Sequence, residues 1–278
     1  MTAAEAEAAI AEHGWVAMDL PDPAPVFAVR DRLLSWLRDT IPALASLEEY
    51  HQQVSDTQHV ELLHGLSQQY WDHDLGRTII AGNLDLFRHL VGPDLHVQRY
   101  PYVRAVRPGN IRDAAPLHRD TYYGASPFEV SAVVPFTEMH ASCALRVISG
   151  SHLAPDSDFP YTDTVSPDVV PRSAKHQLGF PYAPRLLDPA LMDRAEPVPL
   201  RVGQVLLFPL SLVHGGGIGG GTHTRFSSDI RVVNSWAPVS MSRGVHPDYF
   251  VPLCQSAITD TARRYQRQRD EAAARESE

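Results

Sequence analysis

The chain has 278 residues, of which 44% are hydrophobic and 21% charged, values typical of a globular protein with a sizeable core. Its formal net charge of −9 disfavours nucleic acid and anionic membranes as main partners, because both attract basic surfaces. No run of about eighteen apolar residues occurs, so the sequence predicts no transmembrane helix.

The N-terminal stretch, MTAAEAEAAIAEHGW, is acidic and alanine-rich. It lacks the basic start and apolar core of a signal peptide, so we expect a cytoplasmic protein. The two cysteines, Cys143 and Cys254, are too far apart to indicate a disulfide framework or a thiolate metal site. The 14 histidines are more than average, which makes a histidine-ligated metal worth testing.

Residues 1–95 are expected to form a largely helical flank. Apolar residues at helical spacing predict helices over 3–12 and 24–46, and two weaker patterns lie around 57–69 and 83–91. Between the first two helices, GWVAMDL has the β-rich composition of a short strand.

Residues 96–258 consist of short β-branched and aromatic runs bounded by Gly, Pro, Asn or Asp, which is typical of antiparallel sheets in a sandwich or barrel. Within this part, residues 153–197 are long, proline-rich and irregular, which predicts a lid-like loop. Residues 259–278 indicate a charged C-terminal helix and tail. Because the chain shows no repeat or linker, we expect a single domain over residues 1–278.

The segment PLHRDTYYG contains two candidate metal ligands, His118 and Asp120. Residues two apart on an extended segment project their side chains in the same direction, so both can reach one ion. His214 is the best candidate for a third ligand, because it ends an apolar strand just before a glycine-rich turn. Two histidines and one carboxylate leave the opposite positions of an iron(II) ion open for dioxygen chemistry.

These residues also allow other interpretations. An H-x-D pair is common by chance and does not establish a metal site alone. The HGGG sequence that begins at His214 also resembles the oxyanion loop of esterases. The chain has no G-x-S-x-G elbow, however, since ISGSH lacks the final glycine. The esterase interpretation is therefore the weaker one.

The segment TRFSSDIRVV strengthens the metal hypothesis. Four polar residues share one face of the predicted strand: Arg225, Ser227, Asp229 and Arg231. An arginine with a serine two positions later suits a small dicarboxylate, because the guanidinium pairs with the carboxylate in bidentate fashion and the hydroxyl adds a hydrogen bond. The alternative is a surface strand with ordinary charges.

Taken together, these motifs resemble the iron(II)/2-oxoglutarate oxygenases, specifically the phytanoyl-CoA dioxygenase (PhyH)-like branch. EHGWVAMDL resembles the opening of the family, and YPYVRAVRPG leading into PLHRD resembles its approach to the metal. ISGSH resembles the usual P-G-S-H turn, with Ser149 where proline is common. HGGG through RFSSDIR resembles the closing strands. The resemblance covers most of the chain.

The resemblance implies a role for each matching residue. His118, Asp120 and His214 would bind iron(II), and Arg225 with Ser227 would hold the distal carboxylate of the cosubstrate 2-oxoglutarate. A polar side chain on the strand before the motif, Gln98 or Arg104, would be a secondary contact to the cosubstrate. In related halogenases the carboxylate ligand is lost, so Asp120 implies oxygenation rather than halogenation.

The implied fold is mainly β with flanking helices, built on a double-stranded β-helix (a cupin-like jelly roll). The implied reaction couples decarboxylation of 2-oxoglutarate to succinate with oxidation of a small molecule by dioxygen. Hydroxylation is the main expectation, and cyclisation, desaturation and epimerisation stay open. The bias toward Ala, Arg, Asp and Pro suggests a high-GC bacterium and hence natural-product biosynthesis.

Three other functions remain. The chain could be a non-catalytic metal-containing jelly roll that binds small ligands, or an acyl-CoA or lipid hydroxylase. It could also be a zinc hydrolase with Glu138 or Asp229 as the general base. The oligomeric state and the roles of His152, His223 and His246 stay open.

Overall fold

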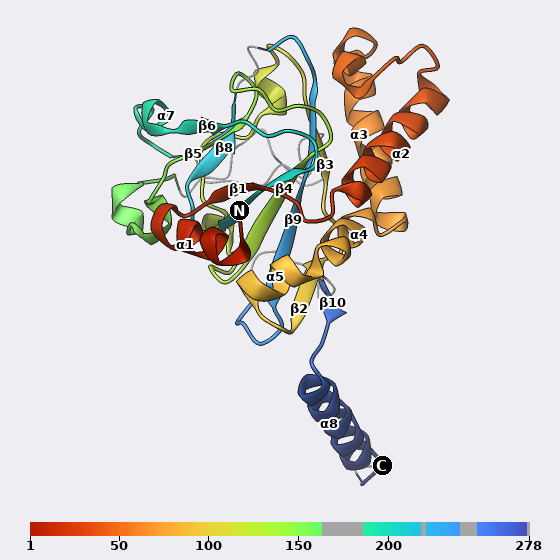
Figure 1. The fold of residues 1–278 in the computed structure, drawn as a ribbon, viewed down its shortest axis with the longest axis vertical. Coiled ribbons are helices and arrows are strands. Elements are labelled where there is room, and N and C mark those ends of the chain that lie inside the picture. Colours follow the sequence, from red (N-terminus) through yellow and green to blue (C-terminus); the bar gives the residue numbers. More distant parts are fainter. Residues whose placement is uncertain (163–185, 218–220, 240–248, 277–278) are drawn as a thin grey trace.

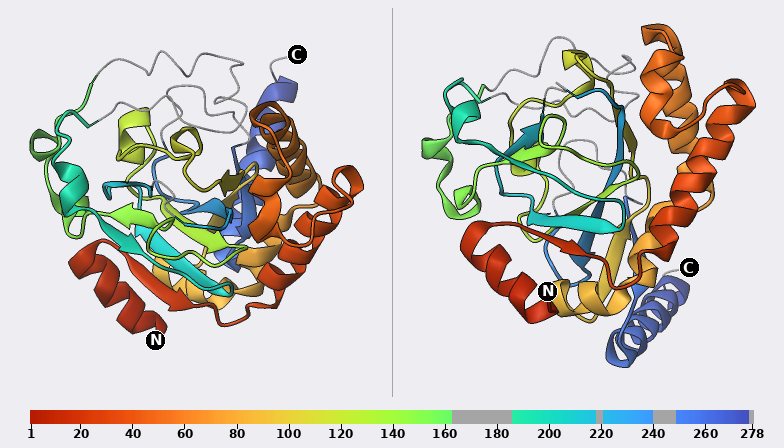
Figure 2. Two further views of the ribbon diagram at one scale, coloured as in Figure 1. Left: turned by 90° about the horizontal axis from the view of Figure 1, so that it is seen from above. Right: turned by 45° about the horizontal axis from the view of Figure 1, so that its top comes forward.

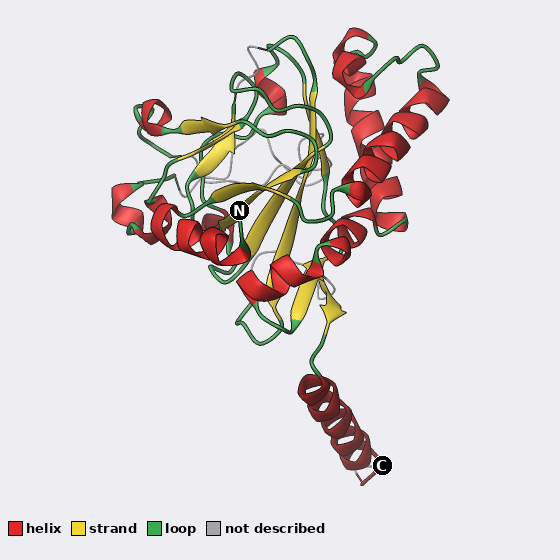
Figure 3. Ribbon diagram, viewed as in Figure 1, coloured by secondary structure: helices red, strands yellow, loops and turns green. Residues whose placement is uncertain are grey.

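The computed structural model describes residues 1–162, 186–217, 221–239 and 249–276. These residues form two antiparallel sheets with helices packed beside them (Figures 1 and 3). The helices are α1 (Ala3–His13), α2 (Ala24–Thr40), α3 (Asp56–Asp72), α4 (Leu75–Gly82), α5 (Leu84–Val91), α7 (Leu191–Arg194) and α8 (Ala257–Glu276). The strands are β1 (Val16–Asp19), β2 (Leu95–Gln98), β3 (Val103–Val106), β4 (Val130–Pro135), β5 (Leu145–Val147), β6 (Glu196–Val198), β7 (Gln204–Pro209), β8 (His214–Gly216), β9 (Arg225–Asn234) and β10 (Phe250–Cys254).

The helices mostly follow the predicted periodicity, with two differences. The helix predicted over 24–46 ends earlier, at Thr40, because Ile41 precedes Pro42 and a residue before proline disfavours the helical conformation. Helix α4 lies in a stretch for which no helix was predicted. It is short, and its stability comes from burying Ile79 and Ile80 rather than from a cap, since no side chain caps its first turn.

The larger sheet has the strand order β1-β7-β4-β9-β2-β10, and β3 also pairs with β9. The smaller sheet has the order β6-β5-β8. Helices α3, α4 and α5 contact β3, β2 and β9, and α1 contacts the opposite edge at β1 and β7. Figure 2 shows the same arrangement from two further directions.

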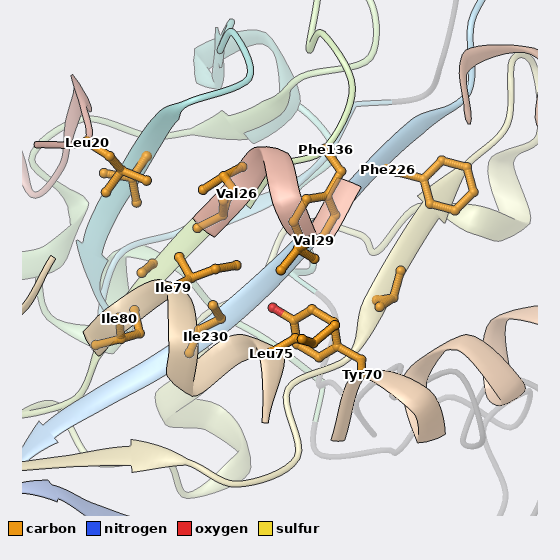
Figure 4. Packing of buried hydrophobic residues seen from close by; sticks show 14 of the residues in the cluster. Leu20, Val26, Val29, Tyr70, Leu75, Ile79, Ile80, Phe136, Phe226 and Ile230 are labelled. Atoms are coloured by element: carbon orange, nitrogen blue, oxygen red, sulfur yellow. The ribbon is translucent and has the colours of Figure 1, made fainter. Parts of the chain in front are cut away.

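The strands of the larger sheet alternate between two environments, as the pleat requires. On β9, one set of side chains enters the core beneath the helices: Phe226, Ile230 and Val232. Figure 4 shows Ile79 of α4, Val29 of α2 and Ile230 turned into this core. The other set lines a cavity on the opposite face of the sheet: Arg225, Ser227, Asp229 and Arg231.

The cavity lies between the two sheets, because its wall includes residues of β4 and β9 from the larger sheet and of β5 and β8 from the smaller one. Its volume is about 120 Å³. Two facing antiparallel sheets with helices on the outer face confirm the predicted mainly-β jelly-roll fold with flanking helices.

Helix α8 extends from β10 away from the sheets (Figure 1). Among the described residues, no helix is both long and apolar enough to cross a membrane. Residues 163–185 of the predicted lid-like loop 153–197, and His246, lie outside the described residues.

Candidate metal centre

Backbone pairing brings the two candidate histidines together. His118 lies in the loop before a short 3₁₀ helix (Asp120–Tyr123), and His214 is the first residue of β8. The His118 N–H donates to the His214 carbonyl at 2.8 Å, and the His214 N–H donates to the His118 carbonyl at 2.9 Å. This antiparallel bridge places the two imidazole centroids 4.5 Å apart.

A glycine beside His214 permits this close approach. A Cβ atom at Gly215 would lie 2.9 Å from the backbone of Pro116 and Leu117. Any side chain at this position would push the PLHRD segment away from β8. The glycine that follows His214 therefore serves close packing of two backbones.

Asp120 completes a group of three ligating side chains. One ligand atom from each of His118, Asp120 and His214 lies within 4.8 Å of the other two. The His118 Nε2 is 3.5 Å from Asp120 Oδ1, and the His214 Nε2 is 3.9 Å from Asp120 Oδ2. All three residues are at most 6% exposed. These side chains are therefore gathered at one buried point rather than spread over separate sites.

Both imidazoles are held in the tautomer that a metal requires. The His118 Nδ1 lies 2.7 Å from the Pro116 carbonyl, and the His214 Nδ1 lies 3.0 Å from the Leu212 carbonyl. A carbonyl oxygen only accepts, so each Nδ1 carries the proton. The Nε2 atoms that face Asp120 then offer lone pairs, as ligating histidines do.

The charge states also suit a metal ion. Burial alone would raise the pKa of Asp120, but the Arg231 guanidinium and the two imidazoles hold that pKa well below its usual range. Burial, helped by the neighbouring His118, lowers the pKa of His214 to about 4. A carboxylate and a neutral imidazole are the ligating forms. The three side chains therefore fit a site for one divalent metal ion.

Arg225 opens onto the same cavity as the three ligands. Its guanidinium is buried, and Nη1 donates to the Cys143 carbonyl at 2.8 Å. Burial lowers the pKa of Arg225 to about 10. In the described part of the chain its Nε has no hydrogen-bond partner, and no carboxylate pairs with it. A buried cation of this kind needs an anion, and a carboxylate is a suitable one.

The other residues expected at the cofactor site have different surroundings. Ser227 and Arg104 line the cavity, and Arg104 Nε donates to Asp229 Oδ1 at 3.0 Å. Gln98 does not line the cavity. Its Nε2 donates to the Tyr100 carbonyl and its Oε1 accepts the Arg231 backbone N–H, so the main chain engages both ends of the amide.

The remaining candidates lie away from the three ligands. Glu138 borders a different surface pocket, where Oε1 accepts the Val202 N–H. The His152 Nε2 lies 3.3 Å from the Ala11 carbonyl, and this contact joins the SGSH turn to α1. His223 is exposed, with Nδ1 2.6 Å from the Thr222 hydroxyl.

Arg119, between the two ligands of the H-R-D motif, has a structural role that its sequence position does not indicate. Its buried guanidinium donates to the carbonyls of Ser151 and Ala154 and to the carboxylate of Asp156. Ser151 also accepts the Val213 N–H through its hydroxyl at 2.9 Å. The SGSH turn therefore connects the segments that carry His118, Asp120 and His214.

Replacing Arg119 by methionine is expected to lower the free energy of unfolding by about 2–3 kcal/mol, because hydrogen bonds to a buried charged group are lost. Urea unfolding measures this change. Arg194→Met is the matched control: Arg194 lies over the Phe159 ring as Arg119 does, but it is exposed. The control should change stability by less than about 0.5 kcal/mol. Equal losses in both variants would contradict the role of Arg119.

A second buried cluster borders the cavity at Asp113. Arg107 Nε donates to Asp113 Oδ2 at 2.7 Å, and His59 Nε2 lies 3.5 Å from Asp113 Oδ1. His59 is 2% exposed, and burial lowers its pKa to about 4. The folded protein therefore holds this imidazole neutral, while the unfolded chain binds a proton near the ordinary value of 6.5.

Acid is consequently expected to destabilise the fold through His59. Between pH 7 and pH 5 the unfolded state gains a proton that the folded state excludes, which corresponds to about 2 kcal/mol from this residue. Urea unfolding of the metal-free protein at both pH values checks this. His59→Phe should show a correspondingly smaller loss of stability on acidification. An unchanged loss in this variant would show that His59 is not responsible.

Comparison with known proteins finds one family match and several structures of similar fold. Residues 38–226 match the family Phytanoyl-CoA dioxygenase (PhyH). No curated protein matches the chain. Among solved structures, apo ThoJ, a non-heme monooxygenase, is similar with a TM-score of 0.57 and 16% identity, covering 90% of this chain and 84% of that one.

Two further structures share the fold. Apo EctD from S. alaskensis has a TM-score of 0.56 and 17% identity, covering 91% of this chain and 84% of its own. The epimerase SnoN, solved with Fe3+, alpha ketoglutarate and nogalamycin RO, has a TM-score of 0.53 and 15% identity, covering 90% of this chain and 98% of its own. At these identities the likeness is one of fold.

Proposed function

This chain belongs to the phytanoyl-CoA dioxygenase (PhyH) family, and on that premise we propose that it is an iron(II)/2-oxoglutarate-dependent oxygenase of a small molecule. Hydroxylation is the proposed outcome, and bacterial natural-product biosynthesis is the proposed setting. The composition of the chain and the fold shared with SnoN, a protein from nogalamycin biosynthesis, support that setting. Cyclisation, desaturation and epimerisation are variants of the same oxidation.

One observation carries this proposal: the three ligating side chains and the buried Arg225 open onto one cavity. His118, Asp120 and His214 are the proposed iron ligands. Iron(II) with 2-oxoglutarate and dioxygen supplies the oxidising chemistry, with succinate and carbon dioxide as by-products. The protein provides the ligands, orientation and exclusion of water.

Arg225 is the proposed anchor of the distal carboxylate of 2-oxoglutarate. Its guanidinium can form a bidentate pair with a carboxylate, and Ser227 lies two positions along the same strand face. Apolar side chains enclose other parts of the cavity: Val133, Met139, Leu145 and Phe208. These residues keep water away from the proposed iron site, which strengthens the electrostatic interactions inside it.

The zinc hydrolase alternative lacks a suitable general base. Glu138 lies at a different pocket, and Asp229 is paired with Arg104. A structural metal would not account for Arg225, because a non-catalytic site has no need for a buried anion anchor. We therefore favour the oxygenase over both alternatives.

Succinate release without an added substrate tests the proposal. The protein is incubated with iron(II), ascorbate and 2-oxoglutarate in air, and succinate and dioxygen consumption are measured. We expect slow succinate formation that requires both iron and dioxygen, and none with zinc(II). Ester hydrolysis supported by zinc without dioxygen uptake would instead favour the hydrolase.

A further inference from the structure

Arg231 contacts a proposed iron ligand from the far end of the polar row on β9. Its Nη2 lies 3.2 Å from Asp120 Oδ1. This side chain is 19% exposed, whereas that of Asp120 is 8% exposed. Arg231 and Arg225 lie at opposite ends of the row, so the cavity has one arginine toward each end of this strand face.

The contact defines the orientation of the Asp120 carboxylate. Arg231 and His118 both approach Oδ1, whereas His214 approaches Oδ2. An arginine on one oxygen fixes the plane of the carboxylate, because the guanidinium donates along fixed directions. Carboxylates that bind metals are commonly oriented by such hydrogen bonds from groups that do not touch the ion.

The position of Arg231 is itself fixed. Its backbone N–H donates to Gln98 Oε1 at 3.1 Å, and its strand pairs on both sides, with β4 and β2. The Arg231 side chain therefore projects from a rigid element. A rigid support is what a group that orients a ligand requires.

Glu129 supplies a compensating negative charge. It is 3% exposed, Oε1 accepts the Ser126 N–H at 2.9 Å, and Oε2 lies 3.8 Å from Arg231 Nη1. Without this carboxylate, a guanidinium beside the ligands would repel a divalent cation. With it, Arg231 can orient Asp120 while adding little net positive charge to the site.

We propose that Arg231 is a positioning residue for the metal site, which holds the Asp120 carboxylate in its ligating orientation while Glu129 balances its charge. This inference rests on the proposed function, because it needs the three ligands to bind a metal. In this proposal, neither Arg231 nor Glu129 is itself a ligand of the metal. Gln98 contributes indirectly, by fixing the backbone of Arg231.

The two possible roles of Arg231, a positioning residue or simply a nearby charge, predict opposite changes in cation affinity when the arginine is removed. If the arginine acted only as a nearby positive charge, its loss would strengthen cation binding. If it orients Asp120, its loss weakens cation binding by about 10- to 100-fold, the usual cost of losing such a partner. The sign of the change in metal affinity therefore separates the two roles.

Cobalt(II) titration of the full chain, followed by visible absorption, measures both affinity and ligand geometry. Arg231→Met should weaken cobalt(II) binding by about 10- to 100-fold and alter the spectrum. Arg231→Lys, which keeps a charged donor, should recover part of the affinity. Glu129→Gln should weaken binding but leave the spectrum unchanged, since Arg231 still orients the carboxylate.

Arg104→Met is the charge-matched control, because Arg104 lines the same cavity but pairs with Asp229 rather than with a proposed ligand. Its cobalt(II) affinity should be equal to or higher than that of the wild type. Equal or tighter binding by Arg231→Met would overturn the inference. If this variant does not fold, Arg231→Lys and Glu129→Gln decide the question, and wild-type affinity and spectrum in both would overturn it.

The same experiment distinguishes failure of the proposed function from failure of the inference about Arg231. A wild-type protein that binds no cobalt(II) would remove the metal site and the inference with it. Wild-type binding that is lost in Asp120→Ala but kept in Arg231→Met would leave the metal site intact and overturn only the role of Arg231.

Discussion

Replacing Asp120 by alanine is expected to abolish 2-oxoglutarate-dependent oxidation and to lower iron(II) affinity by more than about 100-fold, since even partners that only orient a ligand contribute up to this much. The substitution removes the one carboxylate among the three buried ligating side chains. It also leaves Arg231 without its partner at 3.2 Å, so positive charge remains beside the site. Anaerobic iron(II) titration and succinate release measure the two effects.

Asp229→Asn is the matched control for this variant. Asp229 lines the same cavity, but it pairs with Arg104 and is not one of the three ligands. Iron affinity should change far less than in Asp120→Ala. Full succinate release by Asp120→Ala would show that Asp120 does not bind the metal.

Replacing Arg225 by alanine is expected to weaken 2-oxoglutarate binding by about 100-fold while iron(II) affinity changes little. Loss of one partner of a buried charge pair typically costs about 2–5 kcal/mol. Arg225 is buried and lines the cavity, and among the described residues no carboxylate forms an ion pair with it. The dependence of succinate release on 2-oxoglutarate concentration gives the affinity change.

Arg225→Lys should lie between the wild type and alanine, because lysine keeps a charge but not the bidentate geometry. Arg104→Met tests the other arginine that was expected at the cosubstrate. Because Asp229 already pairs with Arg104, we expect a much smaller effect on 2-oxoglutarate binding there. Equal losses of iron and 2-oxoglutarate affinity in Arg225→Ala would mean that the anchor is assigned to the wrong residue.

Local periodicity was sufficient to predict the polar face of β9 and the grouping of His118 with Asp120. Both predictions rest on the rule that alternate residues of an extended chain face the same way. The structure places the polar residues of β9 in one cavity and brings His214 to the H-x-D segment. When a strand is apolar on one face and charged on the other, its alternating sequence pattern predicts which face packs into the core.

Contacts between distant segments could not be predicted in this way. The Arg231–Asp120 pair depends on how the loop after η2 (Ile111–Asp113) passes Arg231 on β9, and no spacing encodes that path. Gln98 was expected near the cosubstrate, but its amide bonds to backbone groups of Tyr100 and Arg231. The role of Arg119 was not predicted at all, because the carbonyls to which it donates lie in a separate turn.

The most direct test of the account is an anaerobic titration of the metal-free protein with iron(II) and then 2-oxoglutarate. An iron(II)–2-oxoglutarate chelate has a weak visible charge-transfer band. We expect this band in the wild type, its absence in Asp120→Ala, and a shift to higher 2-oxoglutarate concentration in Arg225→Ala. Iron binding without a band in the wild type would contradict the oxygenase assignment and leave a structural or hydrolytic metal in its place.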